Sequence, residues 1–236
     1  MGEKIIGILG GMGPEATADL FFRIIRATPV DRDQDHPRTI IYSNSKVPDR
    51  TPAVLGVGPS PVPEMAMAAK ALEGAGADFL IIPCNTAHYF IGELQESVGI
   101  PILHMIELTA EMVSQELPHV KRVGLIATDG TVKSGIYHKS FDEQGVTIIT
   151  PPEFLQRASM KAIYQHIKAG DLKGGRGIVL NVAAHLVKEG AQAVICGCTE
   201  VSLVLKDGDI DVPVVDPLQI LAETAIGIAL EKIAKY

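Results

Sequence analysis

The feature that most constrains the fold is a short pattern that occurs twice in the chain. At 76–84 and again at 190–198, a Gly-Ala pair leads through a run of apolar residues to a cysteine. Such short apolar runs predict strands that are buried on both faces. Hydrogen-bonding residues follow both cysteines, Asn-Thr after Cys84 and Thr-Glu after Cys198. The pattern therefore predicts two similar strands, each of which carries a thiol to its carboxyl end.

Other segments repeat in the same order around these strands. Residues 6–10 resemble 123–127, and residues 100–104 resemble 212–216. Predicted strands alternate with predicted helices, which is typical of parallel sheets covered by helices on both faces. We therefore predict an α/β fold of two similar halves with mainly parallel sheets, related by a pseudo-twofold axis. Because ligands bind beyond the carboxyl ends of parallel strands, we expect the active site in the cleft between the halves.

The two halves are not expected to divide the chain at a single point. We expect a first domain of residues 1–103 with about 214–236, and a second domain of 104–213, with the repeat starting again after 117–121. The stretch 43–63 holds five of the fifteen prolines, so it is expected to be a long loop that can cover a site. Strands are predicted at 4–9, 39–42 and 101–103. Pro14 is expected to open a helix directly after the glycines, and further helices are predicted at 64–73, 86–97, 107–117 and 159–167.

Net charge and composition argue against several classes of partner. The net charge is −7 and there is no Trp. A nucleic-acid partner is not expected, because phosphate binding requires a basic face and base stacking requires aromatic platforms. No apolar run approaches the roughly 18 residues of a membrane span, and the apolar run near the start is too short for a signal peptide. We expect a cytoplasmic protein with no membrane partner, whose three cysteines are thiols.

The placement of the cysteines suggests acid/base chemistry. Cys196 is expected to be a small buried residue on the side of its strand opposite to Cys198. Cys84 and Cys198 each precede a predicted helix, whose positive N-terminal end lowers the pKa of a thiol. One thiolate can take a proton from a carbon while a thiol on the other face delivers one, so the stereocentre inverts without a cofactor. The sequence has no spacing typical of disulfide exchange or of a metal site, so no metal is expected.

Three segments resemble one known family. The glycine-rich segment 10–14, Pro-Cys-Asn-Thr-Ala-His at 83–88 and Gly-Cys-Thr-Glu at 197–200 are similar to the signature segments of the aspartate racemase branch of the aspartate/glutamate racemase family. The resemblance spans nearly the whole chain and implies a racemase that works without pyridoxal phosphate or any other cofactor. Glutamate racemases proper also have a Cys-Asn-Thr segment, but they have His where Glu200 stands and a different opening loop.

The resemblance implies roles for particular residues. By this resemblance, Cys84 and Cys198 are the two residues that donate and accept the proton. Arg50 and Lys168 match family positions that bind the side-chain carboxylate, and a guanidinium fork together with an ammonium suits such a group. The residues that it implies for the α-ammonium or α-carboxylate are Asn85, Thr86 and Thr199.

Several candidate residues have a second, purely structural interpretation. The α-carboxylate can rest on backbone N–H groups around Met12 or on the turn 128–131, where Thr131 adds a hydroxyl or simply caps the next helix. Lys168, one turn after Tyr164, can bind substrate or only complement the C-terminal end of its helix. Glu200 can orient a thiol or an ammonium, or can be an acidic residue in the first turn of a helix.

Two other functions fit parts of the sequence. Residues 11–16 fit the Gly-x-Gly-x-x-Ala turn of dinucleotide-binding proteins, but no acidic residue follows the second strand at 42–44, so an NAD-linked dehydrogenase is disfavoured. Two α/β halves also suit a non-catalytic amino-acid-binding protein with two lobes, but binding alone does not require paired thiols. His88 and His104 are expected to be structural.

We therefore predict an isomerase, a cofactor-independent amino-acid racemase with two catalytic cysteines. It is expected to interconvert L- and D-aspartate, or a close dicarboxylic amino acid such as glutamate. One methylene in a pocket is worth only about 1–3 kcal/mol, so the sequence leaves the choice of substrate open. It also leaves open which cysteine acts on which enantiomer. The resemblance implies a homodimer.

Overall fold

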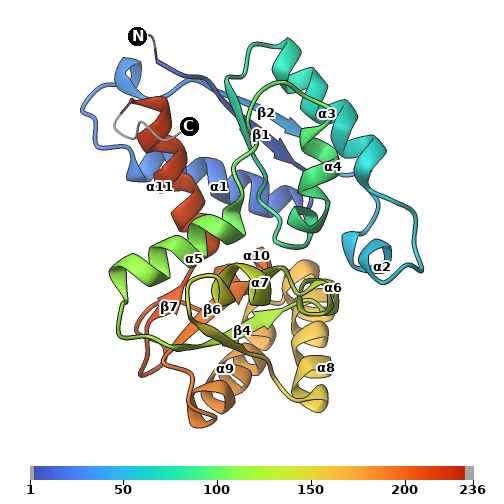
Figure 1. Cartoon of the computed structure of the whole chain (residues 1–236), viewed down its shortest axis with the longest axis vertical. Helices are drawn as coiled ribbons and strands as arrows, with labels where there is room; N and C mark the ends of the chain where they lie inside the picture. The colour runs from blue at the N-terminus through green and yellow to red at the C-terminus, as the bar shows by residue number, and fades with distance from the viewer. Residues whose placement is uncertain (1–2, 232–236) are drawn as a thin grey trace. The chain divides into compact units, whose positions relative to one another are not determined.

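The computed structural model describes residues 3–231 and divides into two compact units (Figure 1). One unit comprises Met1–Met105 with Leu218–Tyr236, and the other comprises Ile106–Pro217. The first unit is therefore assembled from both ends of the chain. Each unit has its own sheet and its own apolar core.

The first unit contains a three-stranded sheet. Its strands are β1 (Ile6–Gly10), β2 (Thr39–Ser43) and β3 (Phe79–Ile81), all parallel and in the order β2-β1-β3. The strand predicted at 101–103 forms only a bridge between Ile102 and Leu80. The helices are α1 (Pro14–Ala27), α2 (Arg50–Val54), α3 (Val62–Gly74), α4 (Ile91–Gln95) and α11 (Pro217–Ala229), with 3₁₀ helices η1 (Asp33–Asp35) and η2 (Thr86–Phe90).

The second unit contains a four-stranded sheet. Its strands are β4 (Arg122–Ala127), β5 (Thr147–Ile149), β6 (Ala193–Gly197) and β7 (Val214–Val215), all parallel and in the order β5-β4-β6-β7. The helical segments are α5 (Met105–Glu116), α6 (Asp129–Ser134), α7 (Ile136–Asp142), α8 (Glu153–Lys161), the π-helix η3 (Ala162–His166), the 3₁₀ helix η4 (Ile167–Ala169), α9 (Leu172–Lys188) and α10 (Thr199–Val204).

The two sheets share one strand order. In each sheet the strand that opens the repeat, β1 or β4, is central, and the strand that leads to a cysteine, β3 or β6, pairs with it. These four strands are almost entirely buried, as their continuous apolar sequences predict. The prediction of an α/β fold with two similar parallel sheets is confirmed.

Local differences from the prediction have identifiable causes. The stretch 43–63 is not a continuous loop, because the Asp49 side chain accepts the Thr51 N–H at 3.0 Å and starts helix α2. The single helix predicted at 86–97 is instead η2 followed by α4. The Cys84 carbonyl is bonded to the His88 ring, and the His88 N–H bonds the Asn85 carbonyl three residues back, which is the 3₁₀ pattern.

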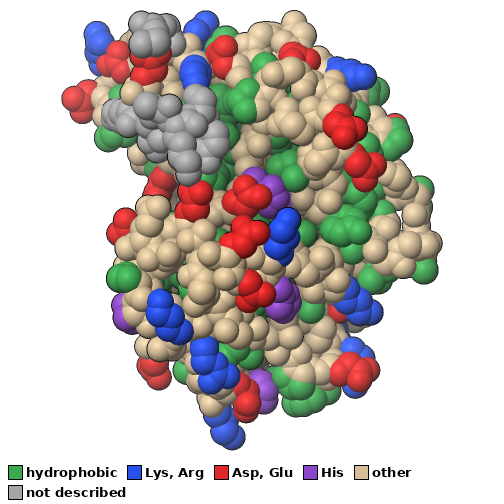
Figure 2. All heavy atoms as spheres, viewed as in Figure 1, with side chains coloured by type: hydrophobic (Ala, Val, Ile, Leu, Met, Phe, Trp, Pro, Cys, Tyr) green, Lys and Arg blue, Asp and Glu red, His purple; other side chains and the backbone are tan. Residues whose placement is uncertain are grey.

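None of the helices within residues 3–231 combines the length and the apolar character that crossing a bilayer requires. On the face drawn in Figure 2, Lys and Arg side chains are interspersed with Asp and Glu side chains. The net charge of the whole chain is −7.

Candidate active site

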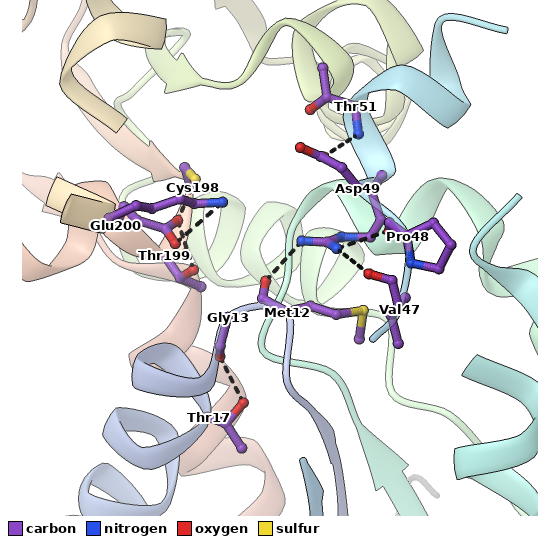
Figure 3. Close-up of polar contacts among 12 residues, drawn as sticks. Met12, Gly13, Thr17, Val47, Pro48, Asp49, Thr51, Cys198, Thr199 and Glu200 are labelled. Carbon is purple, nitrogen blue, oxygen red and sulfur yellow. Dashed lines mark hydrogen bonds and ion pairs between the residues drawn. The ribbon is translucent and has the colours of Figure 1, made fainter. Parts of the chain in front are cut away.

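The glycine-rich turn after β1 is fixed by Thr17 of α1. The Thr17 hydroxyl accepts a hydrogen bond from the Gly11 N–H at 2.8 Å. It donates one to the Gly13 carbonyl at 2.9 Å (Figure 3). Gly11 has a φ of +94°, and a Cβ there would collide with the backbone of Asn44. The turn therefore requires glycine at this position, and it places Met12 in the buried interior of the first unit.

Arg50 lies inside the first unit rather than in solvent. Arg50 is only 9% exposed. Its guanidinium donates hydrogen bonds to the carbonyl oxygens of Val47 at 3.4 Å, Pro48 at 3.0 Å and Met12 at 3.4 Å (Figure 3). These carbonyls hold the planar group in one orientation. Arg50 and Met12, which the sequence nominated separately, are therefore in direct contact.

Cys84 follows β3 and precedes η2. It is a buried free thiol and belongs to the same apolar cluster as Met12. Asn85 and Thr86, the next two residues, are buried as well. The first unit thus brings Met12, Arg50 and Cys84 to one end of its sheet, beyond the carboxyl ends of β1 and β3.

Cys198 follows β6 and is the N-cap residue of α10. Its Sγ donates a hydrogen bond to Glu200 Oε2 at 2.8 Å, and the Thr199 hydroxyl donates to the same oxygen at 3.3 Å (Figure 3). Cys198 and Glu200 are each only 8% exposed. One buried carboxylate therefore binds both the thiol and its neighbouring hydroxyl.

Lys168 faces the other oxygen of the same carboxylate. Its Nζ lies 3.8 Å from Glu200 Oε1 and 4.5 Å from the centre of the Tyr164 ring. An ammonium over an aromatic face is attracted by the ring, and the contact agrees with the spacing of one helical turn between Tyr164 and Lys168. The preceding segment η3 is a π-helix, a feature that is frequent at functional sites.

The electrostatics of Cys198 are opposite to the expectation from the sequence. Burial raises the pKa of the Cys198 thiol well above its ordinary value, and the Glu200 carboxylate raises this pKa further, whereas the Lys168 ammonium lowers it. The N-terminal end of α10, a helix of six residues, does not outweigh these effects. Cys198 is therefore a protonated thiol at neutral pH, and the prediction of a lowered pKa was wrong for this residue.

Thr131 and Cys196 are both buried in the second unit. The Thr128 hydroxyl caps α6 by accepting the Thr131 N–H at 3.3 Å, and the two hydroxyls are 3.2 Å apart. The capping role considered for Thr131 thus belongs to Thr128, while Thr131 is completely buried. Cys196 is buried in β6 with its Sγ 3.9 Å from the Leu205 carbonyl, as expected for a small core residue. Cys196 and Cys198 belong to the same apolar cluster, and residues two apart along a strand point to the same face, so the expectation that they lie on opposite sides of the strand was wrong.

Most of the predicted residues, but not Thr131, gather into one group in each unit. Contacts join Lys168, Cys198, Thr199 and Glu200 in the second unit, whereas Thr131 bonds within its own turn. Among residues 3–231, no cluster of three or more His, Cys, Asp or Glu side chains has an arrangement suited to a metal. Sequence reasoning missed Thr17 and set His88 aside. Each of these side chains binds the backbone carbonyl of the residue four positions before it: Thr17 binds Gly13, and His88 binds Cys84.

Comparisons with known proteins decide the class of this chain. Residues 9–225 match the model of the family described as Asp/Glu/Hydantoin racemase. The chain belongs to this racemase family. Over 233 residues it is 28% identical to the broad specificity amino-acid racemase RacX of Bacillus subtilis, a match that covers 94% of this chain and 96% of that relative.

Solved structures of racemases match nearly the whole chain. The aspartate racemase of Picrophilus torridus superposes with a TM-score of 0.87 at 32% identity, covering 96% of this chain and 94% of that one. An aspartate racemase homologue from Pyrococcus horikoshii gives a TM-score of 0.78 at 30% identity, with coverages of 96% and 99%. The predicted resemblance to the aspartate racemase branch is confirmed, and this racemase is an isomerase that acts on amino acids.

Proposed function

We propose that this racemase interconverts L- and D-aspartate by a two-base mechanism in which Cys84 and Cys198 exchange the α-proton, without pyridoxal phosphate or a metal. One observation carries the proposal. The two cysteines follow corresponding strands, β3 and β6, of two sheets with the same strand order. Two equivalent thiols suit a reaction that needs one base and one acid of the same kind.

In the proposed reaction, each cysteine changes protonation state once per turnover. The Cys84 thiolate takes the α-proton of one enantiomer, the freed electron pair delocalises onto the α-carboxylate, and the Cys198 thiol gives its proton to the opposite face. The products are the other enantiomer, a Cys84 thiol and a Cys198 thiolate. The opposite enantiomer follows the same steps in reverse. Both sulfurs must therefore reach the same carbon from opposite faces.

Glu200 is the proposed partner of Cys198. The hydrogen bond from Sγ to Oε2 at 2.8 Å and the raised pKa of the buried thiol support a resting state in which Cys198 is the proton donor. When Cys198 works in the other direction it starts as the thiolate, and the Lys168 ammonium, 3.8 Å from Glu200 Oε1, offsets the second negative charge beside the carboxylate. Glu200 is thus a positioning residue for the thiol in this proposal.

The substrate carboxylates require separate anion sites. For the α-carboxylate we propose hydrogen bonds from Asn85, Thr86 and Thr199, with Thr131 and the backbone at Met12, because donors aimed at the developing negative charge stabilise the carbanion. For the side-chain carboxylate we propose Arg50 and Lys168. The guanidinium of Arg50 is held by carbonyls, while Lys168 divides its interactions between Glu200 and Tyr164. Arg50 is therefore expected to contribute more to binding aspartate.

A broader substrate range is the second candidate. It is favoured by the match over 94% of the chain to a racemase with the printed name of a broad specificity enzyme. Glutamate is a further candidate substrate, because the one methylene by which it differs from aspartate changes the binding free energy by only about 1–3 kcal/mol. An enzyme specific for aspartate depends on its side-chain carboxylate, whereas a broad one accepts neutral amino acids as well.

The experiment is to incubate the purified full chain, with no cofactor added, with single L-amino acids in heavy water. Chiral chromatography measures the D-enantiomer and mass spectrometry measures deuterium at Cα. The proposal expects D-aspartate with deuterium at Cα and little turnover of alanine or lysine. Turnover of many amino acids supports the broad alternative. Binding of aspartate with neither product nor deuterium would contradict both.

The remaining expectations are part of this proposal. We propose that the domains are residues 1–103 with about 214–236 and residues 104–213, and that the protein is a cytoplasmic homodimer. The only partner proposed beyond the second copy is the dicarboxylic amino acid. Size measurement in solution tests the oligomer, and separate expression of 104–213 tests whether that domain folds by itself.

A further inference from the structure

The backbone at Cys84 is held on both sides. The Cys84 N–H donates to the Ile82 carbonyl at 2.8 Å. The Cys84 carbonyl oxygen lies 2.8 Å from Nδ1 of His88. These two bonds fix the peptide groups before and after the residue, and so they fix the direction of the Cα–Cβ bond from which Sγ extends.

The His88 ring replaces a bond that the backbone would otherwise make. In an α-helix the N–H of residue 88 would bond the carbonyl of residue 84. Here the His88 N–H bonds the Asn85 carbonyl at 3.1 Å, and the ring occupies the Cys84 carbonyl instead. The ring bond therefore accompanies the 3₁₀ turn by which the chain leaves Cys84.

The tautomer of His88 follows from this partner. A carbonyl oxygen only accepts, so Nδ1 carries the hydrogen. The residue is 1% exposed, and burial lowers its pKa to about 3, with the neighbouring His104, whose ring centre is 5.2 Å away, lowering it further. The ring is therefore neutral, and Nε2 is a buried nitrogen with no hydrogen-bond partner within the described chain.

We infer that His88 is a positioning residue for Cys84, which holds the Cys84 carbonyl through Nδ1–H and so fixes the thiol in the place from which it reaches the α-carbon. This inference rests on the proposed role of Cys84. Its effect comes from one directional hydrogen bond in a buried turn. Misplacing a reacting group by about 1 Å can lower a rate by about 100-fold.

Three substitutions separate the directional bond from the bulk of the ring. His88→Asn places an amide N–H where Nδ1–H was, His88→Gln places it near the position of Nε2, and His88→Leu removes it. We expect kcat to fall by about 10- to 100-fold in His88→Leu and His88→Gln, with KM changed much less, and to recover to within about threefold of wild type in His88→Asn. His138→Leu in α7, a half-buried histidine, is the matched control and should keep wild-type kcat.

A second readout isolates Cys84. In a Cys198→Ala background, exchange of the α-proton in heavy water depends on Cys84 alone, so adding His88→Leu should slow this exchange by the same factor as kcat. In the reciprocal Cys84→Ala background, His88→Leu should leave the exchange catalysed by Cys198 unchanged. Circular dichroism checks that each variant is folded. If His88→Leu does not fold, the difference between Asn and Gln decides the question.

Equal kcat in His88→Asn and His88→Gln would overturn the inference, as would wild-type kcat in His88→Leu. Equal slowing of the exchange in both single-cysteine backgrounds would also overturn it, because it would indicate a general structural defect. The failure of the proposed function gives a different pattern. In that case Cys84→Ala itself keeps racemase activity, whatever the histidine variants do.

Discussion

Glu200 should control how readily Cys198 loses its proton. The substitution Glu200→Gln keeps the size of the side chain and a hydrogen-bond acceptor but removes the negative charge. The acceptor oxygen lies 2.8 Å from Sγ. At this separation the repulsion between a carboxylate and a thiolate is about 1.5 kcal/mol even with the dielectric constant of water, and several times larger at an effective value of about 20.

The charge removal should therefore enlarge the thiolate fraction of Cys198 at least about tenfold, because about 1.4 kcal/mol corresponds to a factor of ten. The assay is the rate of alkylation of Cys198 by iodoacetamide at neutral pH, measured for each cysteine by peptide mass spectrometry. Lys168→Met should have the opposite sign, since the ammonium favours the thiolate. Glu153→Gln, an exposed acid paired with Arg157, is the matched control and should leave the rate unchanged.

The result that refutes this reasoning is equally direct. Alkylation of Cys198 in Glu200→Gln at the wild-type rate, or more slowly, would mean that the carboxylate does not hold the thiol in its protonated form. Faster alkylation with undiminished racemisation would mean that the contact exists but that turnover does not use it.

Three further predictions concern stability and binding. Acid should destabilise the fold through His88, because the pKa of its ring is about 3 in the native state against an ordinary value of 6.5, so the unfolded state binds more protons below pH 6.5. The wild type should therefore lose about 2 kcal/mol more of its free energy of unfolding than His88→Asn does between about pH 7 and about pH 5, measured by urea unfolding. Gly11→Ala should lower the free energy of unfolding by about 2 kcal/mol or more, whereas Gly56→Ala, also at positive φ but facing open space, should cost only about 1 kcal/mol; equal losses would contradict the account of the turn. Arg50→Lys should raise KM for aspartate by about 10- to 100-fold through the lost fork geometry, with kcat changed less, and an unchanged KM would remove Arg50 from the substrate site.

The duplicated strands could be predicted because their apolar sequences depend only on burial. The runs that precede Cys84 and Cys198 have no alternation, and such sequences suit strands covered on both faces. The glycines and Pro14 after the first strand likewise indicated a tight turn before a helix, which the structure contains. These features are local, so a single sequence is enough to predict them.

The properties that depend on distances between side chains could not be predicted in the same way. The sign of the pKa change at Cys198 was wrong because a short helix was weighed without the carboxylate that lies against the thiol. The turn after Cys84 is 3₁₀, and a ring nitrogen four residues along the chain binds the Cys84 carbonyl. Arg50 is buried because the segment around it folds into α2 and carries its guanidinium to three carbonyls.

The central claim is tested most directly by following the α-proton of each aspartate enantiomer in heavy water with Cys84→Ala and Cys198→Ala. The account predicts that both variants lose racemisation, and that each still exchanges the α-proton of one enantiomer only, a different one in each variant. Racemisation at the wild-type rate in either variant, or exchange of the same enantiomer by both, would contradict it.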